Sequence, residues 1–399
     1  MDVWALGDAG LAAVLWTVFV LYAVSVVSWG LEVGWFSRGW RTDEFPYDAS
    51  DARVRIMTVN ATDVVRRTVE AVPAKMGRPQ VIAEEDIDVP GADVFVVPAE
   101  FECVAERKGR ALEWARQHVP CEREFVLYLD EDTLITDVDG FPDADIVQFS
   151  ERPVNTGSRL AYLTDVFRLG YHLEQRAFHR LSVPLYAWGG GIAVRREFED
   201  AVTWNRRTLI EDTKFAWQAA DVPDFDFRLL RRQFVNQAPP SLRALVKQRR
   251  RWMSGSREDA HGLPRRYWLF YGLRNAAWGL SLVVPVFAVV SYLRPGALPY
   301  PRVYTLGTLC LLGFLFGWSF LGARAVGANL KTTLLAVVAT PVTNFLHSVG
   351  AAYGVLFPPR TFEVTEKVAF EDIPEDEDQT VDLADVIEEN HGLDVELDD

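Results

Sequence analysis

Cysteine is scarce in this 399-residue sequence, which contains only three. Cys103, Cys121 and Cys310 have no metal-ligand spacing, and one of them lies in an apolar segment. This pattern argues against a cysteine metal site and fits a reduced, cytoplasmic environment. Internal repeats and nucleic-acid-binding motifs are also absent, so we expect no nucleic-acid partner.

Basic residues are missing from the N-terminus, which carries Asp2 and Asp8 and shows no small-residue cleavage pattern. These absences argue against a cleaved signal peptide. The first apolar stretch, from about Leu11 to Phe36, is long enough to cross a bilayer core of about 30 Å. We therefore predict an N-terminal transmembrane anchor over residues 1–40.

Three further apolar stretches lie within residues 263–360, and together with the anchor they predict about four transmembrane helices. The last stretch contains Pro341, Asn344 and His347, so it is also compatible with a re-entrant segment. The approximate bounds of the three stretches are Phe270–Leu293, Val303–Gly322 and Thr332–Phe357.

The distribution of arginine predicts the orientation of the large domain between the first and second spans. Arg38 and Arg41 follow the first span, and six arginines between positions 249 and 266 precede the second. Because cytoplasmic loops carry the excess of basic residues, we expect residues 41–262 to form a cytoplasmic domain of a multi-pass cell-membrane protein.

Acidic residues are concentrated at the C-terminus. From Glu371 to Asp399 there are 14 Asp and Glu and no Lys or Arg, which accounts for nearly all of the net charge of −15. Runs of one charge are usually solvated, so residues 361–399 are predicted to be an acidic, disordered tail. A segment that docks a protein is the alternative.

Short apolar runs separated by polar turns and helix-like stretches fill the region between the first two spans. This alternation is typical of an α/β domain with a mostly parallel sheet and flanking helices. Ligands of such sheets bind beyond the carboxyl ends of the strands, where Asp130 is expected. The predicted strands are Val54–Val59, Val81–Ala83, Val94–Val97, Phe125–Leu129 and Ile146–Phe149. The predicted helices are Thr62–Val72, Ala105–Val119, Leu160–Leu181, Thr213–Ala220 and Ser241–Trp252.

Two carboxylates stand at the end of one of these strands. Asp130 and Asp132 are two residues apart in an extended segment, so both can point to one side. Such a pair is suited to a divalent cation, Mg²⁺ or Mn²⁺, whose remaining ligands are substrate phosphates. The alternative is an acidic turn after a buried strand.

A second pair of carboxylates, Glu211 and Asp212, precedes the helical stretch that starts at Thr213. A carboxylate within hydrogen-bond reach of a hydroxyl group can act as a general base, and Asp212 is our candidate for this role. The alternative is capping of the helix, because carboxylates are stabilised at helix N-termini.

Three residues at helical spacing, Gln248, Arg251 and Trp252, fall on one helix face. Arg251 can pair with phosphate oxygens, Gln248 can form hydrogen bonds, and Trp252 can stack on a sugar ring or lie at the membrane interface. A basic cluster that only sets the membrane topology is the alternative, and Arg249 and Arg250 are expected to serve that purpose in either case.

Weaker signals suggest further ligand contacts. Lys108 and Arg110 are at the start of a predicted helix, where free backbone amide groups favour binding of a diphosphate. The alternative is that both side chains are simply solvated at the helix start. Glu85 and Asp86 follow the second predicted strand and are candidates for hydrogen bonds to a base or ribose. Gly190, in the run Trp188-Gly189-Gly190-Gly191, lets the backbone approach a ligand, or belongs to a plain loop.

The motifs Asp130-Glu131-Asp132, Glu211-Asp212 and Gln248-Arg249-Arg250-Arg251-Trp252 together resemble those of membrane-bound inverting family 2 glycosyltransferases. The resemblance spans roughly residues 53–252. Within that group, residues 126–136, 108–112 and 165–168 most resemble the egghead-type β-1,4-mannosyltransferases. The resemblance implies a GT-A-like nucleotide-sugar-binding domain.

The resemblance also implies roles for individual residues. Asp130 would face the nucleotide sugar, Asp132 would bind the metal, and Asp212 would be the base. The diphosphate and the acceptor sugar would be held by Gln248, Arg251 and Trp252.

The expected reaction is metal-dependent transfer of a sugar from a nucleotide diphosphate sugar to a lipid-linked or glycolipid acceptor at the cytoplasmic membrane face. In the egghead type, the sugar is mannose and the donor is GDP-mannose. Two alternatives stay open. One is a processive polysaccharide synthase, and the other is a catalytically inactive membrane scaffold that binds partners through its acidic tail.

Overall fold

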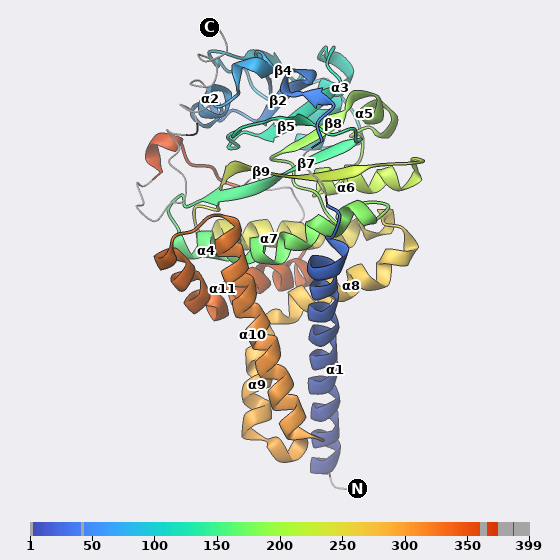
Figure 1. Ribbon diagram of the computed structural model, residues 1–399, viewed down its shortest axis with the longest axis vertical. Coiled ribbons are helices and arrows are strands. Elements are labelled where there is room, and N and C mark those ends of the chain that lie inside the picture. The colour runs from blue at the N-terminus through green and yellow to red at the C-terminus, as the bar shows by residue number, and fades with distance from the viewer. Residues whose placement is uncertain (1–2, 41–43, 360–364, 374–385, 387–399) are drawn as a thin grey trace.

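The computed structural model describes residues 3–40, 44–359, 365–373 and 386. An α/β domain lies at one end, and a bundle that contains α1 (Val3–Leu31), α9 (Val284–Leu293) and α10 (Pro301–Ala325) extends from it (Figure 1). Two further helices, α8 (Arg265–Leu280) and α11 (Leu330–Leu356), lie between the domain and the far end of the bundle.

A seven-stranded sheet with the order β4-β3-β2-β5-β8-β7-β9 forms the centre of the domain. The pairs β4–β3, β3–β2, β2–β5 and β7–β9 are parallel, and β8 is antiparallel to both of its neighbours. The mostly parallel sheet predicted from the sequence is therefore confirmed. The strands of this sheet are β2 (Ala52–Thr58), β3 (Gln80–Ala83), β4 (Asp93–Val96), β5 (Phe125–Asp130), β7 (Ile146–Val154), β8 (Ile192–Arg195) and β9 (Phe227–Gln237). A two-stranded sheet is formed by β1 (Tyr47–Asp48) and β6 (Gly140–Phe141).

Apolar side chains on both faces of the central strands hold helices against the sheet. In β5, Val126 and Tyr128 face the cluster that contains Leu112 of α3 (Lys108–His118), whereas Leu127 and Leu129 face the opposite cluster. All four β5 side chains are at most 1% exposed. This burial on two faces explains why β5 is a continuous apolar run rather than an alternating one.

The helices of the domain start within three residues of where the sequence predicts them, except α5 (Arg196–Val202), which the sequence did not predict. Ser158 and Ser241 cap two of them, because each hydroxyl accepts a hydrogen bond from a backbone N–H of the first turn. The stretch predicted as one helix over Leu160–Leu181 continues as a 3-10 helix after His172. These helices are α2 (Thr62–Glu70), α3 (Lys108–His118), α4 (Arg159–His172), α5 (Arg196–Val202), α6 (Glu211–Gln218) and α7 (Leu242–Glu258).

Four helical stretches of the described chain are long and apolar enough to cross a membrane, as the sequence predicts. They are Gly7–Phe36, Arg265–Leu293, Pro301–Ala325 and Leu330–Leu356. The last of these, α11, contains Pro341 and packs extensively against α7 and α4 of the domain.

Glycine allows the domain and the bundle to approach closely. A side chain at Gly322 of α10 would lie 1.8 Å from the backbone oxygen of Val166 in α4, and one at Gly170 of α4 would lie 1.8 Å from the backbone oxygen of Trp318. The two helices are thus in backbone contact, which fixes the distance between α4 and the membrane helices.

The segment 365–373 corrects the prediction of a solvated tail that begins at residue 361. Val368 exchanges two hydrogen bonds with the side chain of Gln237, and Phe370 packs against a small apolar cluster. Glu371 pairs with Arg67 at 3.0 Å. These contacts hold the segment on the domain, and most of the acidic residues of the predicted tail lie outside the described residues.

Candidate active site

A cavity of about 1020 Å³ opens at the carboxyl ends of β2 and β5 and continues between the helices beneath the sheet. Asp130 is the last residue of β5, and Thr58, the last of β2, donates a hydrogen bond to Glu131 at 2.6 Å. The cavity collects residues from many parts of the chain that are far apart in sequence. Of the predicted site residues, it is lined by Lys108, Arg110, Asp130, Asp132, Glu211, Asp212, Gln248, Arg251 and Trp252.

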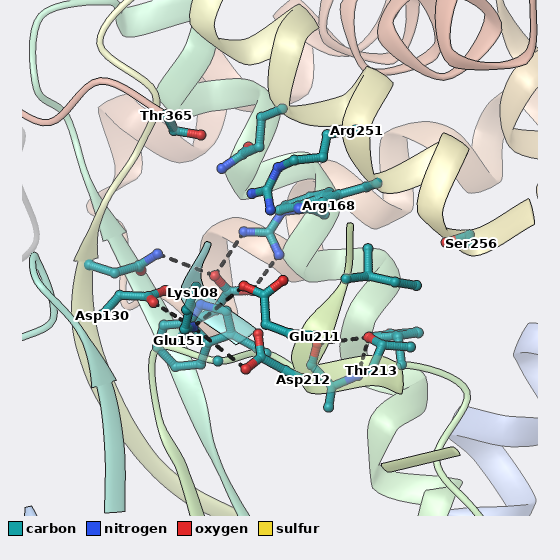
Figure 2. Close-up of a pocket in the computed structure, with 18 of the residues that line it drawn as sticks. Lys108, Asp130, Glu151, Arg168, Glu211, Asp212, Thr213, Arg251, Ser256 and Thr365 are labelled. Atoms are coloured by element: carbon teal, nitrogen blue, oxygen red, sulfur yellow. Dashed lines mark hydrogen bonds and ion pairs between the residues drawn. The ribbon is translucent and has the colours of Figure 1, made fainter. Parts of the chain in front are cut away.

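A single lysine lies among three carboxylates on one wall of the cavity (Figure 2). The ammonium group of Lys108 is 2.7 Å from Asp130, 3.5 Å from Asp212 and 4.0 Å from Glu211. Burial by itself would lower the pKa of Lys108, but the three carboxylates together raise it. The lysine is therefore charged, and the cluster keeps an excess of negative charge.

Asp212 has the properties of a general base. Burial, together with the nearby charges of Glu211 and Asp130, raises its pKa to about 7, although Lys108 opposes the shift. A base is most effective when its pKa is close to the working pH. The expected alternative, a simple helix cap, does not account for this environment, although Asp212 does lie in the first turn of α6.

Gly189 makes room for the Asp212 side chain. A side chain at position 189 would lie 2.1 Å from a carboxylate oxygen of Asp212, which is closer than real side chains approach. The glycine run therefore permits a close approach between the backbone and the candidate base. Gly190, the residue proposed from the sequence, is buried, is not among the cavity-lining residues and faces Trp188.

Asp130 and Asp132 both line the cavity, but each has its own lysine. Asp132 is 1% exposed, lies 2.6 Å from the ammonium group of Lys367 and accepts a hydrogen bond from the backbone of Gln237 at 3.1 Å. Burial would raise the pKa of Asp130, but Lys108 and Lys367 lower it, so this group is a carboxylate at neutral pH.

The donor set fits a divalent cation that is shared with a substrate. No group of three or more His, Cys, Asp or Glu that could hold a metal is present among the described residues. Mg²⁺ is, however, commonly held by one or two carboxylates while phosphates and water complete its shell. Asp130 and Asp132 would supply two hard oxygen ligands, and Lys367 would have to leave Asp132 when a cation binds.

The face of α7 carries the third predicted motif into the cavity. Arg251 donates a hydrogen bond to the backbone oxygen of Leu209 at 3.3 Å, and Gln248 accepts one from Arg249. The guanidinium groups of Arg249 and Arg168 lie 4.1 and 5.5 Å from the ring centre of Trp252. The tryptophan thus stacks on cations inside the cavity wall rather than lying free at the membrane surface.

Arg249 and Arg250, which the sequence predicts to help set the membrane topology, also make specific contacts within the structure. Arg249 is fully buried and pairs with Asp165 of α4. Arg250 lies 4.3 Å from the ring centre of Tyr353 and donates to the backbone oxygen of Phe357. Both side chains hold α7 against its neighbours, which explains the contact between α7 and α11.

Three other predicted residues have different surroundings from those expected. Glu85 and Asp86 do not line the cavity, and Glu85 accepts a hydrogen bond from Asn60 instead. Arg110 lines the cavity but pairs with Glu84 at 2.7 Å and donates to three backbone oxygens of the segment after β4. Its guanidinium group is thus occupied in holding that segment.

Four residues that line the cavity were not among the site residues predicted from the sequence. Lys367 and Thr365 enter the cavity from the segment after the last membrane helix, and their acidic surroundings in sequence gave no sign of it. Glu151 and Arg168 form a buried ion pair that lines the cavity, where burial would raise the pKa of Glu151 but Arg168 lowers it. The Asp165-Val166-Phe167-Arg168 motif was a usable signal for this pair.

Comparisons with known proteins define the class of this chain. The model of the family described as glycosyl transferase family group 2 matches residues 125–345, which is more than half of the sequence. The chain belongs to this family, and the predictions of a family 2 glycosyltransferase enzyme and of its fold are confirmed.

Two particular proteins are similar to it. The β-1,4-mannosyltransferase egh of Drosophila melanogaster is 25% identical over 310 residues, which cover 68% of this chain and 66%, just under two thirds, of that protein. A mannosyltransferase of Pyrobaculum calidifontis, solved with GDP-mannose and Mn²⁺, has a TM-score of 0.50 and 14% identity over 84% of this chain and 98% of its own. At 14% identity, the similarity to the Pyrobaculum calidifontis structure supports the fold alone.

Proposed function

We propose that this chain is an inverting hexosyltransferase that transfers a sugar from a nucleotide diphosphate sugar to a lipid-linked acceptor. The sugar we propose is mannose, and the donor is GDP-mannose. The position of Asp212 carries the proposal. Its carboxylate lies in a cavity that joins the strand ends of a family 2 domain to the membrane helices. A donor from the aqueous side and an acceptor from the membrane side can both reach it there.

The reaction we propose is a direct displacement. Asp212 accepts the proton of an acceptor hydroxyl while the oxygen bonds to the anomeric carbon of the donor sugar. The bond between that carbon and the diphosphate breaks, and the electron pair leaves with the nucleotide diphosphate. Attack from the face opposite the leaving group inverts the configuration.

Positive charge is required where the diphosphate leaves. Lys108, Lys367 and Arg251 line the cavity and are placed to offset the negative charge that develops there. When bound to Asp130 and Asp132, a divalent cation would neutralise diphosphate charge in the same region. The basic residues that flank the first two spans favour a catalytic domain on the cytoplasmic face.

The test is to incubate the purified, detergent-solubilised protein and membrane lipids with a panel of nucleotide sugars plus Mg²⁺ or Mn²⁺. Nucleotide diphosphate release and the masses of the lipids are then measured. Release from GDP-mannose, with a lipid that gains one hexose, supports the proposal. Release from another donor alone contradicts the mannosyl assignment, and absence of release from every donor contradicts the enzyme assignment.

A further inference from the structure

Two arginines lie against the same tryptophan just beyond the end of the first candidate membrane span. The guanidinium carbon of Arg176 lies 4.9 Å from the ring centre of Trp40, and that of Arg231 lies 5.2 Å from it. The ring is anchored on β9, because its Nε1 atom donates a hydrogen bond to the backbone oxygen of Leu229 at 2.7 Å. Arg176 and Arg231, here called the arginine pair, thus hold two positive charges beside one anchored ring.

The arginine pair has no negative partner. Within the described part of the chain, neither guanidinium group forms an ion pair or a hydrogen bond. Burial, together with the nearby charge of Arg231, lowers the pKa of Arg176. The ring of Trp40 attracts both cations but does not neutralise them. An anion that accepts hydrogen bonds from both groups would remove the repulsion between them.

Buried arginines elsewhere in the same domain have carboxylate partners. Arg168 pairs with Glu151 and with Asp165, and Arg249 pairs with Asp165 as well. In these cases the chain itself supplies the negative charge that a desolvated guanidinium group requires. At the arginine pair the described chain does not supply it, so we look for the anion outside the chain.

The arginine pair lies close to the end of a membrane span. The first candidate span is Gly7–Phe36, and Trp40 follows its end by four residues. Arg176 belongs to the 3-10 helix Leu173–Arg180, whose last residue donates a hydrogen bond to the backbone oxygen of Phe36 at 2.7 Å. The 3-10 helix that carries Arg176 is therefore bonded directly to the end of the span, where α1 meets the α/β domain (Figure 1).

The same segment also contacts the start of the second candidate span. The backbone N–H of Ser182 donates a hydrogen bond to the hydroxyl group of Tyr267 at 3.0 Å, and this span begins at Arg265. Trp35 and Trp268, at the corresponding ends of the two spans, are 61% and 46% exposed. Because tryptophan and tyrosine gather at membrane–water interfaces, this level of the molecule is expected to face the lipid headgroups.

Two more arginines stand at this level. The guanidinium carbon of Arg38 lies 4.5 Å from the ring centre of Trp35, and Arg180 donates to the backbone oxygen of Arg38 at 2.5 Å. Both side chains are exposed, and neither pairs with a carboxylate of the described residues. Neither they nor the arginine pair line the active-site cavity, so this positive charge does not serve the donor diphosphate.

We infer that the arginine pair binds the phosphate of an anionic phospholipid, with Trp40 as the ring that aligns the two guanidinium groups. Phosphate oxygens accept paired hydrogen bonds from planar guanidinium groups, and headgroup phosphates lie at the level of the span ends. A zwitterionic lipid brings a positive group of its own and would leave the charge of the arginines uncompensated. The inference goes beyond the proposed function, because this lipid is neither the donor nor the acceptor.

The test measures lipid binding to the full-length protein in detergent by native mass spectrometry. The probes are dioleoyl phosphatidylglycerol, which is anionic, and dioleoyl phosphatidylcholine, which has the same chains and no net charge. We expect phosphatidylglycerol to bind at least about tenfold more tightly. Glycerol phosphate is the soluble arm of the test, and binding of it as tight as that of phosphatidylglycerol would overturn the assignment to a lipid.

The double substitution Arg176→Gln/Arg231→Gln should weaken binding of phosphatidylglycerol by about tenfold or more, because both phosphate contacts are lost. Binding of phosphatidylcholine should change little. The melting temperature of the lipid-free variant should not fall, since the repulsion within the arginine pair is removed. A lower melting temperature with unchanged lipid binding would assign the pair a structural role only and overturn the inference.

The matched control is Arg265→Gln/Arg266→Gln, which removes the same charge from exposed positions at the start of the second candidate span. It should leave phosphatidylglycerol binding within about threefold, because salt screens the attraction of exposed charges. Equal losses in the two double variants would show general attraction to anionic lipid and overturn the inference.

A single substitution keeps the test available if the double variant does not fold. Arg231 is exposed, so Arg231→Gln should fold normally and already weaken phosphatidylglycerol binding. Unchanged binding in this variant would overturn the inference. Sugar transfer is not measured in any arm, so the result does not depend on the proposed function.

Discussion

The ammonium group of Lys108 lies 3.5 Å from a carboxylate oxygen of Asp212. It lies closer, at 2.7 Å, to Asp130 at the end of β5. One side chain from the start of α3 thereby connects the strand that carries the predicted metal ligands to the helix that carries the candidate base. This connection couples the two halves of the site electrostatically, so the pKa of Asp212 depends on the charge of Lys108.

We expect the substitution Asp212→Asn to lower the rate of sugar transfer by about 10²- to 10⁴-fold, because an amide cannot accept the acceptor proton. Binding of the nucleotide should be nearly unchanged, since the asparagine keeps the size of the side chain. Steady-state rates and calorimetric titration with the nucleotide diphosphate measure the two effects separately. Substantial remaining activity in this variant would rule out Asp212 as the base.

The transfer rate should depend on pH through Asp212. Only the carboxylate form can act as a base, and the pKa of Asp212 is about 7. The value of kcat/KM should therefore rise with pH and level off above a midpoint close to pH 7. This acid limb should disappear in the weakly active Asp212→Asn protein.

Replacing Lys108 should move the same midpoint. Lys108 lowers the pKa of Asp212, so the substitution Lys108→Gln should raise that pKa further. A higher pKa leaves less carboxylate at a given pH, and the acid limb of kcat/KM should shift to higher pH by about one unit. Lys247→Gln, at an exposed position of α7, is the control, and an identical midpoint in the two variants would contradict the coupling.

Strands that coincide with a short apolar run between polar turns were predictable from the sequence. The strands β2, β3, β4 and β5 begin and end within two residues of the apolar runs, because these runs are bounded by polar turns. The strands β8 and β9 were missed. The strand β9 carries Arg228, Arg231 and Arg232 and shifts its register against β7, which interrupts the alternation.

The candidate site was also predictable from the sequence only in part. Each short acidic motif follows a strand or starts a helix, so the local sequence placed Asp130, Asp132 and Asp212 near the cavity. Lys367 comes from a segment that reaches the cavity only through tertiary contacts, such as the hydrogen bonds between Val368 and Gln237. No local pattern contains that information, because the segment's acidic composition indicates solvation.

Contact between α4 and α10 should be sensitive to a single methyl group. The substitution Gly322→Ala forces a side chain against the backbone of Val166, and the helices must separate to accommodate it. We expect a loss of about 2 kcal/mol in the free energy of unfolding. Thermal unfolding in detergent measures the effect.

Gly313→Ala is the matched control for this substitution. It lies on the same helix, and a side chain there meets no atom within 4 Å. It should be neutral or slightly stabilising, because alanine favours helix by about 1 kcal/mol over glycine. Equal melting temperatures for the two variants would show that α4 and α10 are not in close contact.

Lys367 and a divalent cation are expected to compete for the carboxylate of Asp132. The ammonium group of Lys367 is 2.6 Å from Asp132, which is one of the two proposed ligands of the divalent cation. Both positive groups cannot occupy the same carboxylate oxygen. Burial would lower the pKa of Lys367, but Asp132 and Asp130 raise it, so the lysine stays charged and remains a competitor at neutral pH.

The substitution Lys367→Gln should therefore strengthen binding of Mn²⁺ by about tenfold, which corresponds to about 1.4 kcal/mol. Calorimetric titration of the protein with Mn²⁺, without any substrate, measures this directly and does not depend on activity. Lys75→Gln is the control, because Lys75 is exposed and its carboxylate partner, Asp137, lies 3.7 Å away and outside the cavity lining. Weaker or equal Mn²⁺ binding in Lys367→Gln would mean that Asp132 does not share its oxygens between the lysine and the cation.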